Sequence, residues 1–323
     1  MTRFVTAILI SLSCGIFLFA NRFQKVESPK PAFPRLQKVV ETAENIEFTA
    51  TLAPQERWGQ LEDDSDGVYR PKQTPWRRRP LPNRSDFPTW KIESKFERDV
   101  FTFVRIQYDA YGPFGWWDRW DNDYPDGDWN FSFRLKQLTS MEVAPNGKVL
   151  RLSDPELLNH PFAYMAGVQY MRLDSREQAA FRRYLLNGGF VMMDDFWTDD
   201  AIDNVFQEMQ RVLPNSKPVE LSLDHPIFHL VYDLKELPQV TDLKTWQEGY
   251  KFEHWHRGYT SDQAPHFWAY FDDNDRMVAL LCHNNDVGDG WEREGENREY
   301  FLEFSEKKSY PLGINIITYA MTH

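Results

Sequence analysis

An adjacent pair of carboxylates, Asp194 and Asp195, directly follows a short apolar run at residues 190–193. Two neighbouring carboxylates at the end of a buried strand can hold a divalent cation. They can also separate their pKa values, so that one acts as a general acid and the other as a general base. The alternative is structural, because an aspartate after a strand commonly caps the next helix while its neighbour faces water. We take both aspartates as candidate catalytic residues and keep helix capping as the competing interpretation.

Histidines supply a second set of candidates. His225 and His229 are separated by three residues, a spacing that permits metal ligation. Pro226 lies between them and prevents a regular helix, so the His-x3-His geometry of helical zinc sites is excluded. A further pair, His254 and His256, is separated by one residue, and no His-Glu-x-x-His or paired Cys-x-x-Cys spacing occurs. We predict no cofactor and assign no metal ligands, with a divalent metal kept as an alternative.

Aromatic and polar residues form further candidate ligand sites. Residues 115–130 are dense in tryptophans and aspartates, a mixture typical of sugar binding because indole faces stack on sugars while carboxylates accept hydrogen bonds from hydroxyls. The same indoles could equally belong to the core, and Pro125 breaks the order of an EF-hand loop. A second polar segment, residues 283–286, contributes Asp286 to the candidate catalytic residues. The candidate ligand-binding residues are Asp123, Tyr124, Asp128, Asn130, Trp197, His283, Asn284 and Trp291.

The elements that must position these residues alternate between strands and helices. Apolar runs predict strands at residues 100–108, 141–143, 162–166, 190–193, 267–271 and 277–282, and helices that begin near residues 128, 175, 199 and 312. This alternation predicts an α/β domain with a mainly parallel sheet covered on both faces. Ligands of open α/β sheets bind at the carboxyl ends of the strands. We therefore expect one functional edge, formed by Asp109, residues 167–169, residues 194–197 and residues 283–286.

The composition is that of a folded protein and excludes one class of partner. The 323 residues are 41% hydrophobic and 27% charged, which is enough to bury a sizeable core. The 37 basic side chains are outnumbered by 49 acidic ones, and a net charge of -12 provides no electrostatic surface for nucleic acid. Two cysteines, Cys14 and Cys282, cannot form a disulfide framework. Cys282 lies in an apolar strand, which predicts an inert buried thiol.

The N-terminal part of the chain differs from the rest. The first 20 residues carry one charge, Arg3, before an apolar run at residues 4–19 that is typical of an export signal. Cleavage near Ala20 would release the protein, whereas retention would leave a membrane anchor and make the membrane a partner. Prolines in the following segment break every long element, as in a spacer. We expect a periplasmic protein, secreted or anchored, with a leader (1–20), a spacer (21–99) and one α/β domain (100–323).

Several motifs occur in order along residues 100–323. They include Asp123-Tyr124-Pro125, Asp194-Asp195-Phe196-Trp197, Asp224-His225-Pro226-Ile227-Phe228-His229 and Gly288-Asp289-Gly290-Trp291-Glu292. In these motifs the chain resembles the bacterial family called domain of unknown function 4159, which is similar to class I glutamine amidotransferases. The resemblance implies a flavodoxin-like three-layer sandwich, in which amidotransferases carry a cysteine on a tight turn after a central strand. That turn would fall near Asp194 and Asp195, so the nucleophile is absent and glutaminase activity is not implied.

Two functions are compatible with the sequence. The absent nucleophile favours an extracytoplasmic binding or assembly module, with carbohydrate or an envelope protein as its partner. The alternative is a hydrolase, with or without a metal, acting on a saccharide or a cell-envelope polymer; His225-Pro226-Ile227 resembles an element of trehalose-utilisation proteins. The hydrolase hypothesis requires five side chains to meet in one pocket at the edge of the sheet: Asp194, Asp195, His225, His229 and Asp286.

Overall fold

The structure is a computed structural model that describes residues 82–323, except residues 94, 96–98, 113–114, 117–118 and 257. The expected leader lies outside the described residues, as does the expected spacer up to residue 81. In the described part of the chain, no helix combines the length and the apolar character needed to cross a bilayer.

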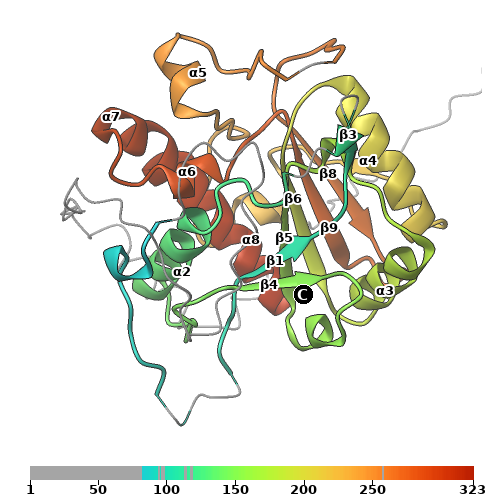
Figure 1. The fold of residues 1–323 in the computed structure, drawn as a ribbon, viewed down its shortest axis with the longest axis horizontal. Helices are drawn as coiled ribbons and strands as arrows, with labels where there is room; N and C mark the ends of the chain where they lie inside the picture. The colour runs from blue at the N-terminus through green and yellow to red at the C-terminus, as the bar shows by residue number, and fades with distance from the viewer. Residues whose placement is uncertain (1–81, 94, 96–98, 113–114, 117–118, 257) are drawn as a thin grey trace, which may run out of the picture.

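Seven strands form one sheet in the order β4-β1-β5-β6-β9-β8-β7 (Figure 1). The strands are β1 Val104–Gln107, β4 Lys148–Arg151, β5 Phe162–Ala166, β6 Phe190–Phe196, β7 Val219–Glu220, β8 His266–Phe271 and β9 Met277–His283. The first five strands in this order, β4, β1, β5, β6 and β9, pair in parallel. The last two, β8 and β7, extend the sheet in antiparallel fashion. A separate two-stranded hairpin is formed by β2 Tyr111–Gly112 and β3 Gly115–Trp116. The expected α/β domain with a mainly parallel sheet is confirmed.

Helices cover both faces of the sheet. The helices α3 Ser175–Leu186 and α4 Asp199–Val212 pack on one face, and α2 Asp126–Leu138 and α8 Tyr310–Thr322 pack on the other (Figure 1). Every side chain of β5, β6 and β9 is buried. An uninterrupted apolar strand, rather than one that alternates, is what a sheet covered on both faces requires.

Local sequence signals explain most of the helix boundaries. Asp174 begins α3 with a capping box, because its side chain accepts from the Glu177 backbone while the Glu177 side chain accepts from the Asp174 backbone. The predicted start of α4 at Asp199 is confirmed. The helix predicted from residue 128 begins earlier, at Asp126, directly after Pro125, which lies at its N-cap position. The last helix, α8, is also longer than predicted and continues directly from α7 Arg298–Tyr300 and a π-helical segment Phe301–Ser309; the short helix α6 Asp289–Glu292 lies before them.

Of the strands predicted on this side of the sheet, one was too long and one was wrong. The strand expected at 100–108 is shorter, and Phe101 makes only an isolated bridge to Val143, which is all that remains of the strand expected at 141–143. The chain instead supplies β4, which the sequence analysis missed. Its charged ends and single fully buried side chain, Leu150, suit an edge strand, which needs no continuous apolar run.

Unusual backbone angles gather at the carboxyl ends of the strands. Asp195, Thr198 and Asn284 have positive φ angles of 53°, 86° and 55°, and Asp123 nearby has 61°. Positive φ is uncommon for residues other than glycine and concentrates at functional sites. The pairing of β6 with β9 shifts register between Met193 and Phe196, so Asp195 lies in a strand irregularity. The backbone strain therefore marks this edge as the place to look for function.

Candidate functional site

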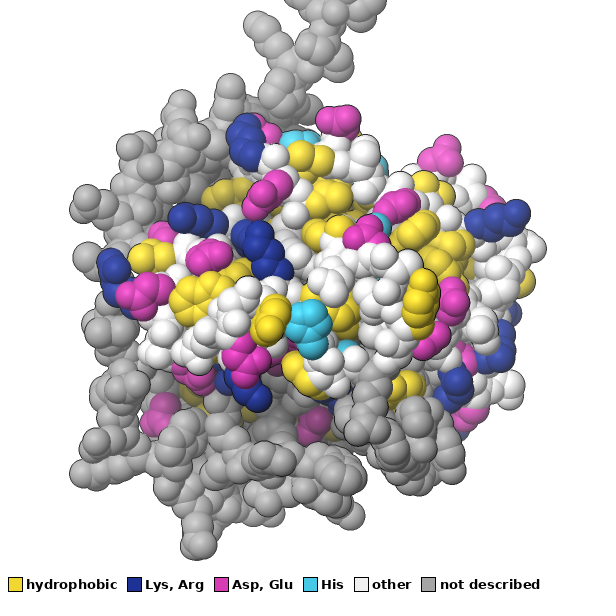
Figure 2. Space-filling view, turned by 90° about the horizontal axis from the view of Figure 1, so that it is seen from above, with side chains coloured by type: hydrophobic (Ala, Val, Ile, Leu, Met, Phe, Trp, Pro, Cys, Tyr) yellow, Lys and Arg dark blue, Asp and Glu magenta, His cyan; other side chains and the backbone are white. Residues whose placement is uncertain are grey.

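A polar cavity of about 270 Å³ opens at the carboxyl edge of the sheet. Its walls contain more carboxylates than guanidinium groups. They are formed by Arg119, Asn122, Asp123, Asp242, Trp255, Asp286, Asp289, Glu292 and Arg293. On the face seen from above in Figure 2, acidic, basic and apolar side chains are interspersed rather than gathered into one acidic patch. The cavity walls, by contrast, contain five carboxylates and two guanidinium groups.

Asp195 is fully buried at the carboxyl edge of the sheet. Its Oδ2 accepts a hydrogen bond from Asn122 Nδ2 and lies 3.6 Å from Arg119 Nη2. Its Oδ1 has no hydrogen-bond partner and lies 3.9 Å from His256 Nε2. Burial raises the pKa of Asp195 to about 6, although Arg119 and Asn122 act in the opposite direction. One oxygen of a buried carboxylate is therefore left facing an imidazole nitrogen.

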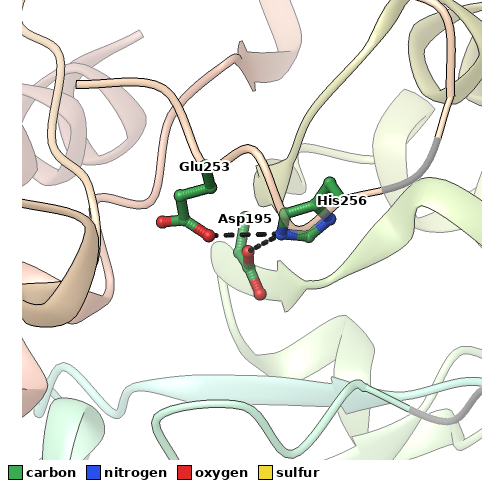
Figure 3. A group of neighbouring side chains, drawn as sticks. All are labelled: Asp195, Glu253 and His256. Carbon is green, nitrogen blue, oxygen red and sulfur yellow. Dashed lines mark hydrogen bonds and ion pairs between the residues drawn. The ribbon is translucent and has the colours of Figure 1, made fainter. Parts of the chain in front are cut away.

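Glu253 and His256 reach Asp195 from the loop between α5 Leu243–Gln247 and β8. Glu253 Oε2 lies 3.2 Å from His256 Nε2, and both side chains are almost completely buried (Figure 3). The other ring nitrogen, Nδ1, lies 2.9 Å from Gln169 Oε1. Since an amide oxygen only accepts, Nδ1 carries the proton and the Nε2 lone pair faces the carboxylates in the neutral ring. Burial lowers the pKa of His256 well below its ordinary value and raises that of Glu253.

These three residues form a set of ligands suited to a cation. One ligand atom from each of Asp195, Glu253 and His256 lies within 4.8 Å of the others. A lone pair and two carboxylate oxygens repel one another unless a proton or a cation lies among them. His256 is among the histidines singled out from the sequence, whereas Glu253 is not. The signal available was the Glu-x-x-His spacing of Glu253 and His256.

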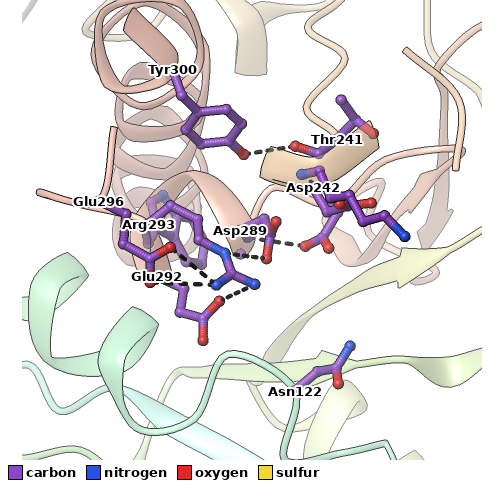
Figure 4. Close-up of polar contacts among 12 residues, drawn as sticks. Asn122, Thr241, Asp242, Asp289, Glu292, Arg293, Glu296 and Tyr300 are labelled. Atoms are coloured by element: carbon purple, nitrogen blue, oxygen red, sulfur yellow. Dashed lines mark hydrogen bonds and ion pairs between the residues drawn. The ribbon is translucent and has the colours of Figure 1, made fainter. Parts of the chain in front are cut away.

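A second group of carboxylates lines the cavity itself. One oxygen each from Asp123, Asp289 and Glu292 lies within 4.8 Å of the others. Arg293 Nε lies 3.5 Å from Asp289 Oδ1, and Arg293 Nη2 lies 2.9 Å from Glu292 Oε2 (Figure 4). Burial raises the pKa of Asp289 to about 7 and that of Asp123 well above its ordinary value.

Helix capping by the acidic pair, the competing interpretation, was wrong. Asp194 Oδ2 accepts hydrogen bonds of 2.9 Å from the Tyr164 hydroxyl and from Gly288 N. Thr198, not an aspartate of the pair, caps α4 through Ala201 N, and neither Asp194 nor Asp195 faces water. Burial raises the pKa of Asp194 to about 7.

The polar segment after β9 holds this edge together. Asp286 lines the cavity, and its Oδ1 accepts from Asp289 N at 3.0 Å. Asn284 accepts from Thr198 N at 3.2 Å and donates to two backbone carbonyls of the loop before β8. His283 Nε2 lies 2.9 Å from Thr198 O, which makes this nitrogen the donor. Asp286 is therefore placed to contact a ligand, whereas Asn284 and His283 position the loops.

His225 and His229 do not reach this edge. The His225 ring packs near Phe271 and Tyr319, where β8 ends and β9 begins, which is the amino edge of the parallel strands. His229 is engaged nearby with Leu223 O and Asp233. The structure brings together Asp194, Asp195 and Asp286 but not the two histidines, so convergence of all five was wrong.

Most of the candidate ligand-binding residues between 115 and 130 support the fold. Asp128 forms a buried ion pair with Arg105, and Asn130 Nδ2 donates to Trp291 O at 2.8 Å. Trp291 itself is buried against Phe131. Two further candidates are also buried, Tyr124 near the Arg105 guanidinium and Trp197 against His256. Of this set, Asp123 alone lines the cavity.

His283 gives a testable pH dependence. Burial lowers the pKa of His283 to about 4, and its hydrogen bond to Thr198 O opposes this only in part. An unfolded histidine has a pKa near 6.5, so between these values the unfolded chain binds the extra proton and stability falls with falling pH. Between pH 7.5 and pH 5 the wild type should lose about 2 kcal/mol more than His283→Gln in urea denaturation. His266 and the other nearby charges are common to both proteins, and equal losses would contradict the prediction.

Comparison with known proteins identifies the family. Residues 102–321 match the family described as a domain of unknown function, DUF4159. This match covers more than half of the chain, and the protein belongs to that family. A search of curated proteins finds no match.

Proposed function

We propose that this protein is a hydrolase that depends on a divalent cation held by Asp195, Glu253 and His256. The observation that carries the proposal is the approach of His256 Nε2 to two buried carboxylates, 3.2 Å from Glu253 Oε2 and 3.9 Å from Asp195 Oδ1. Asp195 Oδ1 in particular makes no hydrogen bond of ordinary length and angle despite being fully buried, although the nearby Trp197 side chain lowers the pKa of Asp195. Buried carboxylate oxygens nearly always have a partner, and a cation would supply it.

The ligand set fits a catalytic cation. One imidazole nitrogen and two carboxylate oxygens suit zinc, manganese or iron. His256 is oriented through Nδ1 by Gln169, as ligating histidines usually are by an outer partner. Three protein ligands leave coordination positions open, and a cation at such a site acidifies water and polarises a carbonyl or phosphoryl oxygen. Arg119 and Asn122 contact Asp195 and also line the cavity, so the site adjoins the space a substrate would enter.

We propose a saccharide or cell-envelope polymer as the substrate class. Trp255 lines the cavity and is about half exposed, with the Arg119 guanidinium 4.7 Å from its ring centroid. An exposed indole beside carboxylates suits a hydroxyl-rich ligand with apolar faces. The expected export signal supports a periplasmic site of action, with the membrane as a partner if the leader is retained.

The strand order supports a flavodoxin-like fold and the amidotransferase resemblance. Read along the chain, the five parallel strands follow the order 2-1-3-4-5, which is the flavodoxin order. Asp195, at positive φ near the end of β6, would occupy the turn where amidotransferases carry their cysteine. Cys282 is the sole cysteine of the described residues; it is buried in β9, and burial raises its pKa. The lack of this nucleophile keeps a binding or assembly module as the second candidate function.

Metal analysis of the full-length protein tests the proposal. Protein purified without chelator or affinity metal should contain zinc, manganese or iron and should hydrolyse nitrophenyl glycosides or esters until it is chelated. His256→Ala should weaken binding of the cation by more than the roughly 10–100-fold that loss of an outer partner causes. The matched control is His254→Ala, an exposed histidine two residues away. A metal-free wild type that binds no added cation would overturn the proposal, and cation binding without turnover would favour the binding module.

A further inference from the structure

We propose that the cavity binds a second divalent cation through Asp123, Asp289 and Glu292. The inference deepens the proposed function and rests on it, because it makes the candidate hydrolase a two-cation site. The second group lines the cavity directly, whereas Asp195, Glu253 and His256 are absent from its walls. The second cation would therefore be the one that a substrate meets first.

The carboxylates of this group come from α6 and from the segment ahead of α2, which lie close together. Asp289 and Glu292 lie three residues apart on α6, so both point from one side of the helix. Asp123 lies ahead of α2 at a φ of 61°. Its carboxylate packs against Gly288, where a Cβ would collide with Asp123 Oδ2 and with the Tyr164 hydroxyl. A glycine at 288 is thus what allows the Asp123 carboxylate to approach α6 so closely.

Two oxygens of the group are buried without a hydrogen-bond donor. Asp123 Oδ2 and Asp289 Oδ2 have no partner, although these residues are only 9% and 2% exposed. Arg293 contacts Asp289 through the other oxygen, Oδ1, and contacts Glu292. The guanidinium therefore compensates part of the negative charge but leaves the two oxygens unsatisfied. A cation among Asp123, Asp289 and Glu292 would balance the charge that Arg293 leaves uncompensated and would offer these buried carboxylates a partner.

The chemistry of the ligands distinguishes the two sites. The second group offers only oxygen atoms, which suit magnesium, manganese or calcium. The first group includes a nitrogen and suits the transition metals. Manganese can occupy both kinds of site, so it is the probe that should count them. Pairs of neighbouring cations are a recurrent arrangement in hydrolases, where they contact the attacking and leaving oxygens.

Manganese stoichiometry of the full-length protein tests the second site. After chelation and re-equilibration with Mn²⁺, the wild type should bind two equivalents. Asp123→Asn and Glu292→Gln should each bind one equivalent, at the first site. His256→Ala should also bind one equivalent, at the second site. Asparagine tolerates positive φ, so Asp123→Asn preserves the backbone. Glu292→Gln changes a ligand of the same site without altering the residue at positive φ. Asp273→Asn, an exposed aspartate in the β8–β9 turn, is the matched control and should bind two.

The outcomes separate this inference from the proposed function. One equivalent in the wild type, kept in Asp123→Asn and lost in His256→Ala, would overturn the second site and leave the first intact. Two equivalents that persist in both Asp123→Asn and Glu292→Gln would also overturn it, since the second cation would then lie elsewhere. No manganese in the wild type at any concentration would overturn both.

Discussion

Replacing Arg105 by Met should lower the free energy of unfolding by about 3–5 kcal/mol, because it leaves a buried carboxylate without its partner. Arg105 lies in the middle of β1, and both it and Asp128 are almost fully excluded from water. Arg105 Nη2 lies 2.6 Å from Asp128 Oδ1, and Nε also donates to both carboxylate oxygens. Urea denaturation of the two proteins measures the loss.

The same substitution should disturb the site, because Arg105 also holds the segment that carries it. Its Nη1 donates to Trp120 O at 3.0 Å and to Asn122 O at 2.7 Å, on the segment that also contains Asp123. Arg105→Met should therefore weaken cation binding as well as the fold. The double variant Arg105→Met/Asp128→Leu removes both charges and should recover much of the stability.

A surface ion pair provides the control for this prediction. Arg151 and Asp109 form a pair at 2.8 Å in which both side chains are at least 40% exposed. Exposed pairs contribute about 0–1 kcal/mol. Arg151 also contacts the buried Glu177 at 3.2 Å, so the control substitution is Asp109→Asn, which removes only the exposed pair. If Arg105→Met costs no more than Asp109→Asn, the buried pair does not have the role assigned to it.

The strands that could be predicted from the sequence are those whose burial on both faces produces a continuous apolar run. β5 was predicted with its observed bounds, and β6, β8 and β9 within a few residues, because a strand covered on both faces is a continuous apolar run. The start of α3 near residue 175 was predicted, and the structure shows a capping box at Asp174 there. The edge strand β4 was missed, since a strand with one covered edge needs few apolar residues. The order of the strands could not be predicted, because it depends on pairing between distant segments.

The site was predictable only in part, because the spacing of residues in the sequence does not show which of them meet in space. The rule that ligands bind at the carboxyl edge correctly brought Asp194, Asp195 and Asp286 together. His225 and His229 were misplaced because their spacing gives no information on which edge of the sheet they reach. Glu253 and His256 lie in a loop without periodicity, and their partner Asp195 is about 60 positions earlier in the sequence. Asp128 and Trp291 were assigned to ligand binding by residue type, although burial makes them structural.

Without a cation, Asp195→Asn should be more stable than the wild type at pH 8. Burial raises the pKa of Asp195 from 3.8 to about 6. The folded state therefore holds its proton more tightly than the unfolded state, and stability is lost as the pH rises through 6. At pH 8 the ionised carboxylate costs about 2–3 kcal/mol, since each pKa unit corresponds to about 1.4 kcal/mol. Asparagine has nearly the same shape and no charge, so it should recover that amount.

With the cation, the order of stability should reverse. A cation at about 1,000 times its Kd at the first site stabilises the wild type by about 4 kcal/mol. Asp195→Asn loses a ligand of that site and should gain only the stabilisation from the second site, which the wild type gains as well. Denaturation with chelator and with saturating Mn²⁺ measures both states, with the exposed Asp203→Asn on α4 as a matched control that should follow the wild type. A variant that is less stable than the wild type in chelator would mean that Asp195 serves the fold. A reversal of the order between chelator and Mn²⁺ would instead mean that the chain keeps a destabilising carboxylate because a cation binds there. Functional sites often reduce stability in this way.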